Sequence, residues 1–282
     1  MLSPSLPRCY RQLQGALGSK RCMSSISVIS TASQSYVQHL VINRPPANAL
    51  SKDFVRELRM AVAKVQEDTS VRAVVMRSEL PRVFCAGADL KERISMTDEE
   101  TKAFSRLLRE TMDMVAGIKV PVISAVEGAA LGGGLELMLA SDIRVAGKGA
   151  VMGLIETSLG ILPGAGGTQR LPRIIGEARA KELIFTAKKF SAEEAVHLGI
   201  VNYCVEAGQA VAKAEELADR IADMGPMGIH YAKKAIDQGL QVSLKEGMAV
   251  EEENYNKTVG TKDRLEGLRA FRDKRPAVYK GA

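Results

Sequence analysis

Several patterns that would indicate a membrane protein, a metalloprotein or a histidine-dependent enzyme are missing from this sequence. No stretch reaches the roughly 18 consecutive apolar residues that a membrane-spanning helix needs, so no transmembrane segment is predicted. The three histidines, His39, His197 and His230, stand far apart, and none has a partner at metal-ligand spacing. We therefore expect no metal site and no catalysis by histidine.

Cysteine is also sparse. Cys9 and Cys22 lie near the N-terminus, while Cys85 and Cys204 lie far apart and form no Cys-x-x-Cys motif. This pattern excludes a disulfide scaffold and a cysteine zinc site. We expect Cys85 and Cys204 to be reduced, buried side chains, and Cys85 to be a small apolar residue, not a nucleophile.

The motifs of the common nucleotide-dependent and hydrolytic enzymes are absent as well. The run Gly132-Gly133-Gly134 fits neither a Gly-x-Gly-x-x-Gly turn nor a phosphate-binding loop that ends in Gly-Lys-Ser/Thr. The run from Gly164 to Gly167 has its third glycine misplaced for a dinucleotide turn and follows no strong strand. No Gly-x-Ser-x-Gly elbow, His-Glu-x-x-His site or kinase motif set occurs.

Acidic residues are absent from the beginning of the chain, where Asp53 is the first. The first 25 positions carry four basic residues, several serines, and the apolar residues Tyr10, Leu13 and Leu17 at helical spacing. Such a start is typical of a mitochondrial transit peptide, so we predict a leader over residues 1–33 and a location in the mitochondrial matrix. Without those four basic residues the net charge falls from +6 to +2, so the basicity is poor evidence for a nucleic-acid partner.

The rest of the chain alternates short β-rich runs with helical patterns, which is typical of an α/β protein. The strands are expected at residues 37–42, 71–76, 120–126 and 142–145. A helix is expected from Ser51 and Asp53, because apolar residues then recur at three- and four-residue spacing. Further helices are expected at residues 98–118, 134–140, 178–186, 211–224, 228–239, 244–258 and 263–274. We predict one core over residues 34–225 and a helical region over residues 226–282.

Two glycine-rich segments and two glutamates are the candidates for chemistry. The segments 84–91 and 128–136 each follow a β-rich run, and N–H groups from two such loops could converge on one oxygen, as an oxyanion hole requires. Glu136 and Glu156 each lie among apolar neighbours, which favours partial desolvation and a raised pKa. Each glutamate could instead cap a helix or reach solvent, and the spacing alone does not show that the two meet.

These segments resemble those of the enoyl-CoA hydratase/isomerase (crotonase) family. The resemblance covers the chain from about residue 35 to the end, in the family's order, and is closest to the family's mitochondrial methylglutaconyl-CoA hydratases and enoyl-CoA hydratase domain-containing members. It rests on the motifs Asn43-Arg44-Pro45, Phe84 to Lys91, Ala130 to Leu137, Asp142-Ile143-Arg144, Gly160 to Leu171, Thr261 to Gly267 and Phe271 to Pro276. It implies a spiral core of ββα units and a C-terminal helical trimerisation region, with homotrimers or paired-trimer homohexamers.

The resemblance also implies the catalytic roles. Ala88 and Gly133 would each give an N–H group to the thioester oxygen, a contact that accelerates such reactions by about two or three orders of magnitude per donor. Glu136 and Glu156 would flank a water, one taking a proton as the water attacks C3 and the other supplying the proton added at C2. Gly164 would help orient that water. Isomerases commonly keep one such carboxylate, so hydration is favoured and isomerisation is the alternative.

Coenzyme A would enter as part of an acyl-CoA thioester substrate, and no separate cofactor is expected. Phe271 and Lys274 would reach the CoA from the helical region, from this or a neighbouring subunit. The CoA contacts that the resemblance implies are Arg82, Ala86, Gly87, Ala88, Asp89, Leu90, Lys91, Gly133, Phe271 and Lys274.

Some questions stay open at the level of sequence. The acyl group could be a short 2-enoyl chain or 3-methylglutaconyl, whose distal carboxylate would need a cation such as Arg93, Lys102 or Arg109. The roles of acid and base, the choice between trimer and hexamer and the cleavage point are likewise open. RNA binding is a further hypothesis, because the nearest relatives present lysines on one helix. The matching positions here are Lys52, Arg56 and Met60, with Arg59 nearby, so a solvated helix face is the better expectation.

Overall fold

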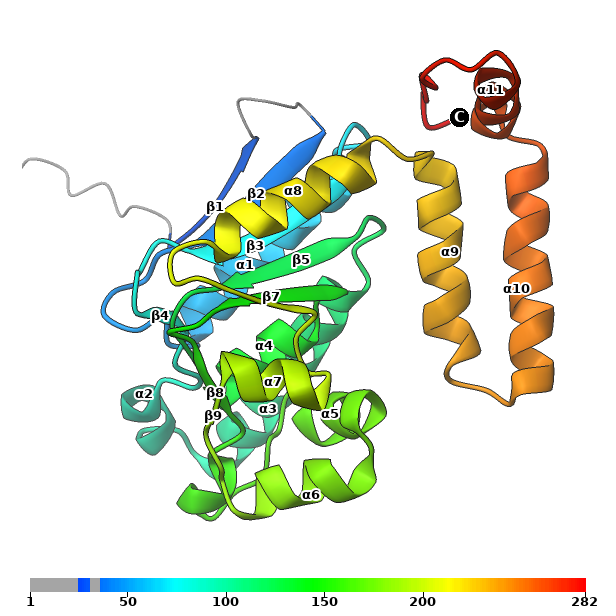
Figure 1. Cartoon of the computed structure of the whole chain (residues 1–282). Helices are drawn as coiled ribbons and strands as arrows, with labels where there is room; N and C mark the ends of the chain where they lie inside the picture. Colours follow the sequence, from blue (N-terminus) through cyan, green and yellow to red (C-terminus); the bar gives the residue numbers. More distant parts are fainter. Residues whose placement is uncertain (1–24, 31–35) are drawn as a thin grey trace, which may run out of the picture.

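Two β-sheets form the core of the protein in a computed structural model that describes residues 25–30 and 36–282 (Figure 1). The larger sheet has six strands in the order β1-β2-β3-β5-β7-β10, and the smaller has four in the order β4-β6-β8-β9. The outer pairs β1–β2 and β8–β9 are antiparallel, and the other pairs are parallel. The strands are β1 (Ile26–Ser30), β2 (Val37–Ile42), β3 (Ala73–Ser78), β4 (Val83–Cys85), β5 (Val122–Val126), β6 (Ala129–Leu131), β7 (Ile143–Gly147), β8 (Val151–Gly153), β9 (Phe190–Ser191) and β10 (Tyr203–Val205).

The chain alternates between the two sheets as it advances. Three times a strand of the larger sheet is followed by a strand of the smaller one, as β3–β4, β5–β6 and β7–β8, and each pair leads into helices. This repetition is the ββα spiral that the resemblance implied, so the predicted fold class is confirmed. The helices of this region are α1 (Lys52–Glu67), α2 (Leu90–Ile94), α3 (Asp98–Ala116), α4 (Gly133–Leu139), the 3-10 helix η2 (Glu156–Leu159), α5 (Gly167–Ile175), α6 (Glu177–Phe185) and α7 (Ala192–Leu198).

The expected helix after Ser51 is α1, and local capping explains where it begins. The Ser51 hydroxyl accepts a hydrogen bond from the Phe54 N–H at 3.2 Å, which satisfies a backbone donor of the first turn. Its apolar stripe, with Phe54, Leu58 and Val62, is fully buried in the main core. Thr97 and Glu100 form a reciprocal capping box at the start of α3. Helices α1 and α3 are therefore fixed by both capping and burial.

The chain ends in a helical arm, which we define as residues 226–282. Helix α8 (Ala210–Ala222) packs small alanine side chains against Val75, Ile123 and Val145 of the larger sheet. The arm follows, with α9 (Pro226–Gly239), α10 (Leu244–Val259) and α11 (Lys262–Arg272) standing to one side of the sheets (Figure 1). Lys233 of α9 ties the arm to the core by an ion pair with Asp142 at 2.7 Å.

The structure bears on the predictions made for the leader, the two cysteines and a membrane span. Strand β1 lies inside the range 1–33 predicted as leader, so the larger sheet extends further toward the N-terminus than the sequence indicated. Residues 1–24 and 31–33 of that range lie outside the described residues. Cys85 is buried as expected, but Cys204 is partly exposed because it lies in the edge strand β10. Across the described ranges no helix is long and apolar enough to cross a bilayer.

Candidate active site

A cavity of about 700 Å³ brings most of the predicted site residues together. It lies where α2 and α3 face the start of α4 and the segment around η2. Both candidate glutamates line it, together with Ala86, Gly87, Ala88, Leu90, Gly133 and Gly164. Residues far apart in the sequence are thus assembled at one place by the spiral.

Glu136 is held by backbone donors that the sequence did not reveal. It lies in the first turn of α4, and only 2% of the residue is exposed. Its Oε1 accepts hydrogen bonds from the N–H groups of Ala165 at 2.8 Å and Gly167 at 2.7 Å. Because Gly167 begins α5, the carboxylate sits at the positive end of that helix. Burial raises the pKa of Glu136, and these two hydrogen bonds oppose that rise by stabilising the charged form.

Glu156 has a less stabilising environment, because among the described residues only its own backbone N–H donates a hydrogen bond to its carboxylate. It begins η2, and its Oε2 is buried without a hydrogen-bond partner among the described residues. Burial, and then the negative charge of Glu136, raise its pKa to about 7. A carboxyl group that titrates near neutral pH is suited to proton transfer. The pair can therefore share one proton between an ionised and a neutral member.

Gly132 lets Glu156 approach the turn before α4. A Cβ at this position would lie 3.0 Å from Glu156 Oε1, and the backbone has a φ of +54°, which disfavours other residues. A Cβ on Gly133 would lie 3.8 Å from Glu136 Oε2. The two carboxylates therefore flank the same glycine turn, so a small molecule bound at this turn would meet both.

The Ala88 N–H is available to a ligand because of its strand geometry. Leu50 N–H donates to Gly87 O at 2.8 Å, and Asp89 N–H donates to Leu50 O at 3.3 Å. Backbone N–H groups alternate in direction along an extended segment, so the Ala88 N–H between these two bonds points away from Leu50. It has no partner within the ranges that the structure describes.

The second predicted donor lies against the first loop. Gly133 begins α4, so its N–H has no acceptor within the helix. Gly87 adopts a φ of +88°, and a Cβ there would lie 2.7 Å from Leu131 O and 3.2 Å from Gly133 N. The two glycine loops are thus in direct contact. The arrangement can place two N–H groups around one oxygen, which is the geometry of an oxyanion hole.

Cys85 stands next to these donors but is unsuited to act as a nucleophile. Its thiol is fully buried and donates a hydrogen bond to Asn48 O at 3.1 Å. Burial raises its pKa to about 12, so the reactive thiolate is not populated near neutral pH. The interpretation of Cys85 as a buried apolar residue is confirmed.

Some predicted CoA contacts lie elsewhere in this chain. Asp89 caps α2 and pairs with Arg44 at 3.3 Å, so its carboxylate already has structural partners. Arg82 and Lys91 are exposed and lie outside the cavity lining. Phe271, which is 88% exposed, and Lys274 lie at the end of the arm, away from α2 (Figure 1). The chain does not bring these last two residues to its own cavity.

The structure adds site residues that sequence reasoning missed. The backbone donors Ala165 and Gly167 come from the glycine-rich run that opens α5, a feature visible in the sequence but assigned only to Gly164. Arg170 donates to Ala165 O at 3.3 Å and pairs with Asp113 at 2.6 Å. These two contacts connect the glycine-rich run before α5 to Asp113 of α3. Arg93, named only as a candidate cation, lines the cavity, as do Lys102 and Arg109.

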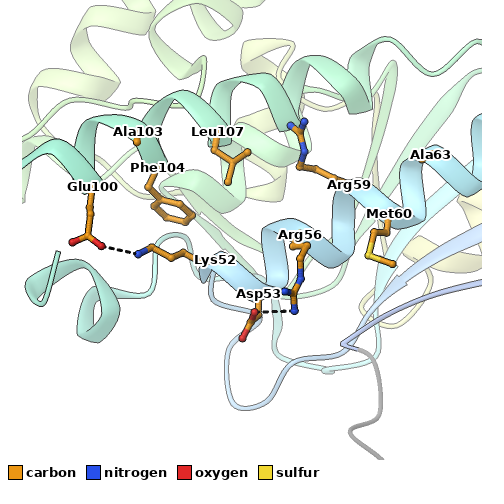
Figure 2. Close-up of a pocket in the computed structure, with 10 residues that line it drawn as sticks. All are labelled: Lys52, Asp53, Arg56, Arg59, Met60, Ala63, Glu100, Ala103, Phe104 and Leu107. Atoms are coloured by element: carbon orange, nitrogen blue, oxygen red, sulfur yellow. Dashed lines mark hydrogen bonds and ion pairs between the residues drawn. The ribbon is translucent and has the colours of Figure 1, made fainter. Parts of the chain in front are cut away.

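The helix face considered for RNA binding lies on a separate groove between α1 and α3 (Figure 2). Its floor is apolar, with Phe104 and Leu107 among the lining residues. Each cation on it has an acidic partner, and the distances are 3.4, 3.1 and 3.8 Å for Lys52–Glu100, Arg56–Asp53 and Arg59–Glu110. The face therefore carries little unbalanced positive charge, which phosphate binding requires.

Comparison with known proteins agrees with the geometry. The mitochondrial protein named probable enoyl-CoA hydratase 2 of Arabidopsis thaliana is 48% identical over 252 residues, which are 89% of this chain and 84% of that protein. The mitochondrial methylglutaconyl-CoA hydratase of Mus musculus is 50% identical over 238 residues, 83% of this chain and 76% of the mouse protein. The crystal structure of an enoyl-CoA hydratase from Bacillus anthracis superposes with a TM-score of 0.88 at 45% identity, covering 92% of this chain and 100% of that one.

The match extends over nearly the whole chain at the level of the family. The sequence profile described as enoyl-CoA hydratase/isomerase matches residues 32–282, which include both glycine loops, both glutamates and the helical arm. Sequence, fold and cavity agree, and the chain belongs to the enoyl-CoA hydratase/isomerase family.

Proposed function

We propose that the protein adds water across the C2–C3 double bond of a 2-enoyl-CoA thioester. The observation that carries this proposal is the pair Glu136 and Glu156, both lining one cavity beside the free N–H groups of Ala88 and Gly133. Isomerisation requires one proton shuttle, whereas hydration requires a group that activates water and a group that donates a proton. The second carboxylate therefore favours hydration.

The reaction follows from the charge state of the two glutamates. Glu136 accepts two N–H hydrogen bonds that stabilise its anion, and its charge helps to keep the proton on Glu156. Glu136 then takes a proton from the water as the water oxygen bonds to C3. Electrons move from the double bond toward the thioester oxygen, where the N–H groups of Ala88 and Gly133 stabilise the enolate. Glu156 gives its proton to C2, and the product is a 3-hydroxyacyl-CoA.

Gly164 lines the cavity next to Ala165, so it is placed to orient the water. The CoA moiety belongs to the substrate, and the proposed reaction needs no separate cofactor or metal. Within the described residues no cluster of three or more His, Cys, Asp or Glu side chains could hold a metal ion.

Location and assembly are part of the same proposal. The similar proteins of Arabidopsis thaliana and Mus musculus carry mitochondrial names, which supports a mitochondrial matrix enzyme of fatty-acid or branched-chain amino-acid breakdown. Because β1 belongs to the sheet, we place the end of the leader before Ser25. The exposed apolar side chains of the arm, including Leu240, Leu244 and Phe271, support a homotrimer or homohexamer. In such an assembly Phe271 and Lys274 would meet the CoA of a neighbouring subunit.

The mass of the product distinguishes hydration from isomerisation. Purified full-length protein is mixed with crotonyl-CoA or 3-methylglutaconyl-CoA, and the CoA products are separated and identified by mass. Hydration adds one water to the mass, whereas isomerisation leaves the mass unchanged. A product of unchanged mass with a shifted double bond would reject the hydratase proposal in favour of an isomerase.

A further inference from the structure

The catalytic cavity has one strongly basic wall. Four basic side chains from α2 and α3 line it, namely Arg93, Lys102, Arg106 and Arg109. The only acidic residues in the described lining are the two catalytic glutamates. If these glutamates share one proton, the cavity keeps an excess of positive charge. Such a cavity favours a ligand that brings negative charge into it.

Arg93 differs from the other three cations in its surroundings, because its Nε is shielded from solvent and lacks a hydrogen-bond partner among the described residues. Lys102 pairs with Glu99 at 3.7 Å on the surface, and Arg109 donates to Gly164 O at 3.0 Å. Arg106 is exposed to solvent. Arg93 is partly buried, and its Nε is shielded from solvent without any hydrogen-bond partner among the described residues. Its guanidinium lies 5.6 Å from the centre of the Phe104 ring, which fixes its position but satisfies none of its N–H donors.

A shielded guanidinium nitrogen without a partner, such as Arg93 Nε, is costly unless a ligand pairs with it. Its place in the cavity indicates which part of the substrate would do so. Arg93 lies one turn into the helix that follows the Ala88 loop and lines the same cavity as Glu136 and Glu156, on whose pKa values its charge has only a minor lowering influence. Arg93 therefore lines the cavity in which the reacting carbons would lie. The acyl chain, which continues beyond those carbons, is the part of the substrate that Arg93 would meet.

The remaining lining suits the carbon chain itself. Ile155, Leu159, Ile161 and Leu162 line the same cavity from the segment around η2. They give an apolar surface for methylene or methyl groups. The cavity thus offers an apolar side for a short carbon skeleton and a cation for a charged group.

We propose that Arg93 binds a carboxylate at the far end of the acyl chain, so that the preferred substrate is a 2-enoyl-CoA whose acyl group is itself a carboxylic acid. This inference rests on the proposed hydratase function and narrows its substrate class. The planar guanidinium can hold both carboxylate oxygens at once, which gives direction as well as charge. The phosphates of CoA are the other source of negative charge, and the test separates the two.

The test compares two substrates of equal chain length. Glutaconyl-CoA carries a terminal carboxylate, whereas pent-2-enoyl-CoA has a methyl group in its place. The measured quantity is the ratio of kcat/KM for the first to kcat/KM for the second. Arg93→Gln is expected to lower this ratio by about 10- to 100-fold, the range for a charge-assisted hydrogen bond, and Arg93→Lys by less. The control is Arg56→Gln, which removes an exposed arginine of the α1/α3 groove and should leave the ratio unchanged.

The outcomes are distinct. If Arg93→Gln lowers kcat/KM equally for both substrates, so that the ratio is unchanged, Arg93 acts on the CoA moiety or on the glutamates. That result would overturn the proposal. Binding of the saturated glutaryl-CoA and pentanoyl-CoA, measured by calorimetry, tests the inference even if no hydration occurs. We expect glutaryl-CoA to bind more tightly to the unaltered protein and to lose that advantage in Arg93→Gln. Equal affinities in the unaltered protein would contradict the inference, whereas failed hydration with a retained glutaryl-CoA preference would reject only the proposed reaction.

Discussion

Glu136 Oε1 lies 2.7 Å from the backbone nitrogen of Gly167, a residue 31 positions further along the chain. This contact places a buried carboxylate at the N-terminus of α5 and stabilises its charged form, which opposes the rise in the Glu136 pKa that burial causes. Glu156 accepts no hydrogen bond from another segment of the described chain, and in the proposed reaction it carries the proton. In the proposed reaction, this difference in backbone contacts explains why Glu136 acts as the base and Glu156 as the acid, although the two side chains are chemically identical.

Gly167→Ala should impair catalysis, because the added Cβ would lie 3.0 Å from Glu136 Oε1 and 2.9 Å from the Leu154 side chain. The carboxylate would be pushed from its place, and misplacement of this kind can cost about 100-fold in rate. Hydration of crotonyl-CoA and thermal unfolding are to be measured together. Gly149→Ala is the matched control, because the added Cβ would lie 3.8 Å from the Glu127 carbonyl oxygen and the residue is exposed. Full activity in Gly167→Ala would contradict the importance of this contact.

Gly87→Ala should weaken binding of the enolate oxygen. The position has a φ of +88°, and a Cβ would lie 2.7 Å from Leu131 O, so the loop that carries the Ala88 N–H must shift away from Gly133. Loss of one oxyanion donor typically lowers kcat by about 100- to 1,000-fold. The assay is steady-state hydration, with circular dichroism as the check on folding. A folded variant with unchanged kcat would show that this loop does not hold the oxygen.

The rate should depend on pH through Glu156. Its pKa of about 7 means that its proton is present below neutral pH and is lost above it. As the proposed acid, Glu156 must be protonated, so kcat/KM is expected to fall as the pH rises through about 7. A profile of kcat/KM between pH 5 and pH 9 tests this expectation. A rate that rises over this range would instead make Glu156 the base.

The same pKa has a consequence for stability. The pKa of Glu156 in the folded protein is above its ordinary value of 4.5, so the folded state binds the proton more tightly than the unfolded state. Proton binding by Glu156 therefore contributes to the free energy of unfolding at pH 4.5 and below, and this contribution is lost as the pH rises through about 7. Glu156→Gln removes this ionisation and should raise the free energy of unfolding at pH 8 relative to the unaltered protein. Denaturant unfolding at pH 5 and pH 8 measures the effect, and an equal change at both pH values would contradict it.

RNA binding stays a prediction, and the groove in Figure 2 weighs against it. Because Lys52, Arg56 and Arg59 are each paired with a carboxylate, short AU-rich RNA is expected to bind only at low salt. A titration monitored by fluorescence anisotropy at several salt concentrations tests this expectation. Tight binding that persists at physiological salt and is lost in Arg56→Gln would contradict the structural interpretation of this face.

The sequence predicted the elements that have a long local signal. Apolar spacing predicts the buried stripe of α1 and the strand β2, and apolar neighbours single out both glutamates, whereas the order of the family's motifs predicts the fold and the roles of the glutamates. The strands β4, β6 and β8 were missed because three residues are too few to show a period. Their pairing depends on the spiral, not on local preference.

The site was predicted less completely, for a similar reason. The donors to Glu136 come from residues 29 and 31 positions away, and nothing local marks Ala165 or Gly167 as partners of a carboxylate. Arg93 could be named as a cation but not placed, since its role depends on which side chains leave it unpaired. Contacts between distant segments are the part of this site that required the structure.

The most direct test of the two-carboxylate mechanism is the hydration rate of crotonyl-CoA, followed by the loss of enoyl absorbance, in Glu136→Gln and Glu156→Gln. Glutamine keeps the size of each side chain but can neither accept nor donate the proton in the reaction. We predict that each variant binds CoA ligands as a folded protein and loses about 100- to 10,000-fold of the rate, the usual contribution of a general acid or base. Near-normal hydration in either variant would contradict the mechanism, because one of the two carboxylates would then be dispensable.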